Sequence, residues 1–194
     1  MTIDGDDAKD FDDAVSIKVS ATGYELGVHI ADVSNYVAPG TPLDRSAYER
    51  ATSTYFPGTV LPMLPFNLSN NVCSLKPHVD RLTLSAIIRL SRGAEVLGYR
   101  FVPSVIRSVN RMTYTEVAGI LANPLLAPDE ATADNLRIMN ELAKKLFQNR
   151  IKGGGLDFDL PEAKITTDSR GEPEKITRAE RNDAHRLIEA SRNC

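Results

Sequence analysis

A run of acidic residues near its start constrains this chain more than any other feature. Six of the ten residues from Asp4 to Asp13 are aspartates. Carboxylates at this density repel one another, so a folded chain tolerates them only where they stay hydrated or where cations neutralise them. Aspartate and glycine are poor strand formers, so the run predicts an irregular turn that leads into an alternating strand from Ala14. Phe11 lies inside the run, which is unusual for a turn that is merely solvated.

Two interpretations of this turn remain open on composition alone, a divalent cation site or a solvated acidic loop. Aspartate oxygens are hard ligands that suit Mg²⁺ or Mn²⁺, and sites built from them leave coordination positions for water and phosphate oxygens. The spacing excludes an EF-hand, because Val15 would occupy the position of the bidentate glutamate. The run holds no cysteine or histidine, which argues against zinc.

Composition indicates an ordinary globular domain. The 194 residues are 42% hydrophobic and 25% charged, enough for one domain with a sizeable core. The net charge of −3 is not typical of a basic nucleic-acid-binding protein. Cys73 and Cys194 show no zinc spacing and are expected to be free thiols in a reducing cytoplasm. No apolar run is long enough to cross a membrane, so no membrane partner is expected.

Hydrophobic periodicity predicts an α+β fold, with a mixed or antiparallel sheet and packed helices. The expected strands form hairpins over 14–38 and 82–109 and a shorter pair around the turn at 169–171. The expected helices run from Pro42 to about Ala51, from the capping box Thr113-x-x-Glu116, over 129–151 and over 181–189. Residues 54–65 carry three prolines and a glycine, which predicts an irregular apolar loop.

Some side chains leave two interpretations open. Tyr55 and Phe56 either anchor the apolar loop in the core or offer aromatic faces to a ligand. The arginines along and just beyond the second arm of the long hairpin either form a solvated strand face or contact phosphates; they are Arg100, Arg107 and Arg111. His29 alternates with apolar residues, which favours a hydrogen-bonded sheet histidine over a ligand.

Several motifs in this chain resemble those of one enzyme family. Residues 2–14, T-I-D-G-D-D-A-K-D-F-D-D-A, closely resemble the signature of the ribonuclease II / ribonuclease R family, the RNB catalytic domain of 3′-to-5′ exoribonucleases. Further similar segments follow in order: L-S-N-N-V-C-S-L at 68–75, R-M-T-Y-T at 111–115, G-G-L-D-F at 154–158 and R-N-D-A-H-R-L-I-E at 181–189. Together they span nearly the whole chain, which is more specific than any one motif.

The resemblance implies a metal-dependent exoribonuclease that hydrolyses single-stranded RNA to nucleoside 5′-monophosphates. It implies that Mg²⁺, or Mn²⁺, is held by Asp4, Asp10, Asp12 and Asp13, of which Asp12 and Asp13 are catalytic. It places Tyr55, Tyr114, Phe158 and Glu189 on the RNA. From the residues alone, Phe158 is predicted to be a buried strand residue and Glu189 a solvated acidic residue on a helix. The alternative is an inactive RNA-binding fragment or pseudo-exonuclease with a structural cation.

The same resemblance bears on domain organisation. Family catalytic domains continue well past the segment that resembles 181–189. We therefore expect residues 1–194 to be a partial RNB exoribonuclease catalytic domain that lacks its C-terminal half.

Overall fold

The computed structural model describes residues 1–56, 59–157, 163–168, 170–178 and 181–192, and its fold is α+β, as expected. The strands are β1 Thr2–Asp4, β2 Asp13–Val19, β3 Gly23–Ala31, β4 Thr54–Phe56, β5 Thr59–Leu61, β6 Asp80–Ser91, β7 Val96–Arg107, β8 Arg111–Thr113, β9 Ala163–Thr167 and β10 Pro173–Arg178. The α-helices are α1 Pro42–Arg50, α2 Tyr114–Ala122, α3 Glu130–Lys152 and α4 Asp183–Arg192.

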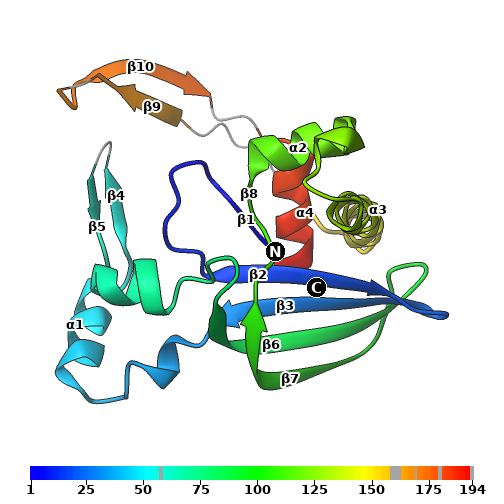
Figure 1. Ribbon diagram of the computed structural model, residues 1–194, viewed down its shortest axis with the longest axis horizontal. Helices are drawn as coiled ribbons and strands as arrows, with labels where there is room; N and C mark the ends of the chain where they lie inside the picture. The colour runs from blue at the N-terminus through cyan, green and yellow to red at the C-terminus, as the bar shows by residue number, and fades with distance from the viewer. Residues whose placement is uncertain (57–58, 158–162, 169, 179–180, 193–194) are drawn as a thin grey trace.

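A four-stranded antiparallel sheet in the order β2-β3-β6-β7 forms the centre of the fold. Both predicted hairpins are confirmed, since β2 pairs with β3 and β6 pairs with β7, the latter with a register shift between Arg89 and Leu90. Helices α2, α3 and α4 gather on one side of this sheet, where α3 contacts β2 and α4 contacts β3 (Figure 1). Helix α1 and the small hairpin β4–β5 lie at the end of the sheet where β2 begins (Figure 1).

The main core lies between the three helices and the first strands. Its buried side chains come from β1, β2, β8, α2, α3 and α4; among them are Ile3, Val15, Met112, Val117, Leu136 and Leu187. A second cluster joins Leu26, Ile88 and Leu90 of the sheet to Leu142 of α3. Ile17 packs against both clusters, so the sheet and the helices share one continuous apolar interior.

Strand β1 does not join the central sheet but pairs in parallel with β8. Thr2 lies opposite Arg111, and Asp4 lies opposite Thr113. The backbone amide of Thr2 also donates to the carbonyl of Asn110 at 3.0 Å. The pairing fixes Asp4 at the end of one short strand and Asp13 at the start of β2, so both ends of the acidic run are held.

The predicted helix starts are confirmed by their capping contacts. The Thr113 hydroxyl accepts from the Glu116 amide at 3.0 Å, and a Glu116 carboxylate oxygen accepts from the Thr113 amide at 2.7 Å, which completes the capping box of α2. Thr41 caps α1 by accepting from the Asp44 amide at 3.2 Å.

The prediction of an irregular loop over 54–65 is wrong in part. Residues Thr54–Phe56 and Thr59–Leu61 form the antiparallel hairpin β4–β5, with Tyr55 opposite Val60. Each strand has only three residues, too few to show the alternation of apolar and polar side chains that predicts a strand. The nearby prolines, such as Pro62 just beyond β5, favoured the prediction of a loop. A short π-helix, Leu68–Val72, precedes Cys73.

The lengths and apolar content of the helices bear on whether a segment could cross a membrane. Within the residues that the structure describes, no helix is long and apolar enough to cross a bilayer.

Candidate active site

The acidic loop, residues 4–13, carries the expected metal ligands and stands between the hairpin β4–β5 and strand β8 (Figure 1). Asp4 and Asp10 are half-buried and Asp12 is exposed, whereas Asp13 keeps 8% of its surface exposed. One carboxylate oxygen of Asp4 accepts from the Gly5 amide at 2.8 Å. A buried carboxylate such as that of Asp13 costs free energy unless a partner or a cation compensates its charge.

The second half of the loop is anchored by Ser74, which is fully buried. Its hydroxyl accepts from the Phe11 amide at 3.1 Å and donates to the Lys9 carbonyl at 2.9 Å. The Leu75 amide adds a bond to the Phe11 carbonyl at 2.8 Å. The Phe11 ring is buried in a small cluster with Cys73 and Leu75, so the acidic loop is not merely solvated.

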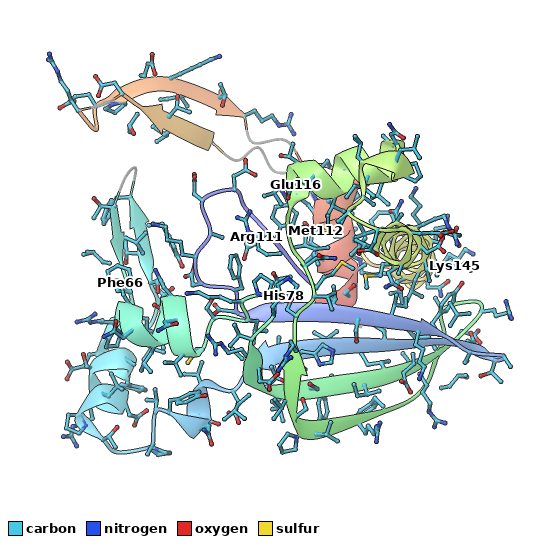
Figure 2. The ribbon with its side chains drawn as sticks, viewed as in Figure 1. Phe66, His78, Arg111, Met112, Glu116 and Lys145 are labelled. Atoms are coloured by element: carbon cyan, nitrogen blue, oxygen red, sulfur yellow. The ribbon has the colours of Figure 1, made fainter. Side chains whose placement is uncertain are left out.

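The first half of the loop is anchored by Arg111 at the start of β8. One guanidinium nitrogen, Nη2, donates to the carbonyls of Gly5 and Asp6, both at 2.9 Å. The Cζ atom of Arg111 lies 5.5 Å from the centre of the Phe11 ring, within cation–π range. Figure 2 shows Arg111 between the loop and β8.

The three arginines around the long hairpin therefore differ in their surroundings. Arg107 forms an exposed ion pair with Asp80 at 2.7 Å, and Arg100 is exposed on the same strand. Arg111 instead binds backbone carbonyls of the acidic loop, a role that neither sequence interpretation included.

Tyr55 of β4 meets the acidic loop at Asp10. Its hydroxyl donates to the Asp10 carboxylate at 3.2 Å, at the long end for such a bond, and the ring is 65% exposed. Burial of the hydroxyl raises the pKa of Tyr55 and the negative charge of Asp10 raises it further, so the phenol remains a donor. The interpretation of Tyr55 and Phe56 as core anchors is wrong, because the hairpin holds both rings out from the core.

The pKa of the Cys73 thiol depends on burial and on the charged side chains near the end of the acidic loop. Its thiol is free, as expected, and buried. Burial raises the pKa of Cys73, and the carboxylates of Asp12 and Asp32 raise it further, against a lowering by Arg81. Asp32 lies in a turn, where its carboxylate accepts from the Ser34 hydroxyl at 2.6 Å. The Cys73 thiol therefore stays protonated. The other cysteine, Cys194, lies outside the described residues.

Two further expected RNA-contact residues already have partners within the protein. The Tyr114 ring stacks on His185 of α4 with centroids 3.9 Å apart. Glu189 accepts two bonds from Arg181, at 3.2 and 2.5 Å, so the interpretation of a merely solvated acid is wrong. Arg181 also donates to Asp157 at 3.0 Å, and these carboxylates raise its pKa. The fourth expected residue, Phe158, lies outside the described residues.

Comparison with known sequences and structures gives these contacts a family context. The sequence model of the RNB domain matches residues 1–192 of this chain. The chain belongs to the RNB domain family.

Its relatives within the RNB family are much longer proteins. Ribonuclease R 1 of Lactococcus lactis is 47% identical over 198 residues, which cover 98% of this chain and 24% of the relative. Mycoplasma genitalium RNase R, solved in complex with ribose-methylated single-stranded RNA, matches with a TM-score of 0.94 and 33% identity over 97% of this chain and 30% of that one. The same protein in complex with double-stranded RNA matches with the same TM-score and identity, over 97% of this chain and 34% of that one. The chain thus spans about a quarter of the length of the curated relative.

The donor set of this RNB chain fits a hard divalent cation in its chemistry. The four expected ligands supply carboxylate oxygens alone, which Mg²⁺ and Mn²⁺ prefer. Among the described residues, no group of three or more acidic, histidine or cysteine side chains is drawn together as a metal-holding cluster. The structure thus places the four aspartates on one anchored loop, and their role as ligands stays a prediction.

Two residues of this RNB chain, Ser74 and Arg111, shape the site through contacts that the sequence did not predict. Ser74 had no predicted role, and Arg111 was expected either on a solvated strand face or at a phosphate. Their contacts join positions 63 and 106 residues apart. A local pattern carries no information about such a pairing, so periodicity and spacing gave no signal for it.

Proposed function

We propose that this chain provides the metal-holding part of a cytoplasmic 3′-to-5′ exoribonuclease that hydrolyses single-stranded RNA to nucleoside 5′-monophosphates. The observation that carries the proposal is the contact between Tyr55 and Asp10, 45 positions apart. It puts an exposed aromatic ring directly beside the acidic loop. Membership of the RNB family and relatives named ribonuclease R support the reaction class.

The acidic residues would hold the cation in this function. Asp4, Asp10, Asp12 and Asp13 would bind Mg²⁺ or Mn²⁺, with Asp12 and Asp13 nearest the reaction. A bound cation of this kind supplies an activated water and neutralises charge on the scissile phosphodiester. The hydroxyl of Tyr55, which donates to the Asp10 carboxylate at 3.2 Å, would orient this ligand.

The aromatic and polar residues would bind RNA. The exposed ring of Tyr55 can stack on any base, because every base has a π-face, and Phe158 would supply a second stacking surface. Tyr114 would contribute to the RNA path while His185 holds its ring. Glu189 can accept from a ribose hydroxyl while bound to Arg181, because each carboxylate oxygen has more than one acceptor position. A ribose contact of this kind separates RNA from DNA.

The test is release of mononucleotides from 3′-labelled single-stranded RNA, with Mg²⁺ or with EDTA. The 194-residue chain is assayed alone and in a chimera in which it replaces the matching segment of Lactococcus lactis ribonuclease R 1. The Asp12→Asn variant should abolish release and keep RNA binding, because it removes a ligand charge and leaves Tyr55 in place. Asp134→Asn, the same change on the exposed face of α3, is the matched control and should leave both unchanged.

The outcomes separate the enzyme from the alternative. Metal-dependent release that is lost in Asp12→Asn supports the proposal. A folded chimera that binds RNA and releases nothing overturns it in favour of a binding module with a structural cation. Release that persists in Asp12→Asn shows that the metal assignment is wrong.

A further inference from the structure

Arg111 occupies an unusual place for a cation in an acidic site. The loop that its guanidinium binds contains six aspartates, yet the bonds from its Nη2 go to the backbone carbonyls of Gly5 and Asp6. Bonds from a charged donor are stronger than neutral ones, and one nitrogen here fixes two successive peptide units.

The surroundings of Arg111 make it a firm anchor. Its backbone starts β8 and lies opposite Thr2, the first residue of β1, which leads into the loop at Asp4. Its guanidinium also faces the buried ring of Phe11 on the far side of the loop. Arg111 therefore ties the beginning and the end of the loop to the same short strand (Figure 2).

The bound carbonyls lie between two expected ligands. Gly5 directly follows Asp4, and its carbonyl also accepts from the Ala8 amide at 3.2 Å, which turns the chain back toward Asp10. Fixing this turn limits where the carboxylates of Asp4 and Asp10 can lie. Groups that orient metal ligands from outside the coordination sphere commonly change metal affinity by about 10–100-fold when they are removed.

We propose that Arg111 is a positioning residue that holds the turn at Gly5 and Asp6 so that the acidic loop can bind a divalent cation. The inference rests on the metal role in the proposed function and adds the group that shapes the loop for it. Positioning by Arg111 would strengthen cation binding, whereas the positive charge of its guanidinium beside the ligands would weaken cation binding by repulsion. The two effects therefore predict opposite signs when the guanidinium is removed.

The experiment uses the full 194-residue chain and Mn²⁺ alone, without RNA. Mn²⁺ affinity is measured by titration with electron paramagnetic resonance, and amide exchange of Ala8 and Phe11 is measured by NMR in metal-free buffer. The variants are Arg111→Met, which removes the charge, and Arg111→Lys, which keeps the charge and loses the planar fork. Arg107→Met is the matched control, because Arg107 bonds to exposed Asp80.

We expect both Arg111 variants to bind Mn²⁺ about tenfold more weakly. The Ala8 amide should exchange faster because its acceptor, the Gly5 carbonyl, is no longer held. The Phe11 amide, bound by Ser74, should change little, and Arg107→Met should match the parent chain. Arg111→Lys retains the long side chain and keeps the test available should Arg111→Met fail to fold.

Each other result overturns one part of the argument. Unchanged Mn²⁺ binding in Arg111→Met overturns positioning. Tighter binding overturns it too and shows that repulsion by the guanidinium charge is the larger effect. Unchanged Ala8 exchange overturns the anchor itself. If the parent chain binds no Mn²⁺ but Ala8 exchange still accelerates in the variants, the metal role in the proposed function fails while the anchoring by Arg111 stands.

Discussion

At the scale of single residues, His29 is a polar side chain of the central sheet that is satisfied by partners on neighbouring strands. His29 of β3 lies within hydrogen-bond distance of the Ser16 hydroxyl, at 2.9 Å from Nε2, and of the Ser85 hydroxyl, at 2.6 Å from Nδ1. The prediction of a hydrogen-bonded sheet histidine is confirmed. Gly27 permits the arrangement, because a Cβ there would lie 2.4 Å from the Ser16 hydroxyl oxygen.

His29 gives the chain a pH-dependent stability. Burial lowers the pKa of His29 below its ordinary value of 6.5, and the N-terminal ammonium lowers it further. Between the lowered pKa and 6.5 the unfolded chain binds more protons, so this contribution is complete above pH 6.5 and falls as the pH drops through that interval. We expect His29→Gln, whose amide can still bond to both serines, to remove this part of the pH dependence.

The measurement is urea unfolding of both chains at pH 8, 7, 6 and 5. The parent should lose more free energy of unfolding than His29→Gln below about pH 6.5. Parallel curves for the two chains would show that His29 titrates normally in the folded state.

At the scale of elements, short capping contacts join the strands to the helices. The capping box of α2 begins at Thr113, which is also the residue of β8 opposite Asp4. The start of α2 and the start of the acidic loop are therefore fixed by one residue.

Thr113→Ala should lower the free energy of unfolding by about 1–2 kcal/mol, because the Glu116 amide loses its side-chain acceptor. Thr115→Ala, at an exposed position in the same helical turn, is the control and should change stability by less than about 0.5 kcal/mol. Urea unfolding at pH 7 measures both. Equal effects of the two substitutions would contradict the importance of the cap.

At the scale of the whole molecule, the main core and the second apolar cluster, which joins the sheet to α3, should unfold together. Ile17 packs against both, and α3 contributes Leu136 to one and Leu142 to the other. Continuous apolar contact of this kind favours a single cooperative transition.

Leu136→Ala should therefore lower stability by about 2–5 kcal/mol and shift the far-ultraviolet and tyrosine fluorescence transitions together. The side chain of Leu136 is fully buried, whereas that of Leu125 is 91% exposed, so Leu125→Ala is the control and should have little effect. Two separated transitions in Leu136→Ala would show that the clusters fold independently.

Much of the fold follows from local sequence. The alternation in β2, β3, β6 and β7, the cap at Thr113 and the apolar stripe of α3 each depend on neighbours within a few positions, so they could be predicted. The hairpin β4–β5 was missed because three residues per strand hardly differ from a loop. The ion pair of Glu189 with Arg181 was missed as well, since side-chain geometry decides which charge an exposed acid meets.

The sequence by itself determined the family and the presence of the acidic loop, because short contiguous motifs identify both. The tertiary structure alone decided how that loop is held: by Tyr55, Ser74 and Arg111, which join it across 45, 63 and 106 positions. The parallel pairing of β1 with β8 likewise joins segments that are distant in the sequence. Such contacts form only when the packed core brings distant segments together, and the free energy that selects them comes from burial of the whole interior, not from any local pattern.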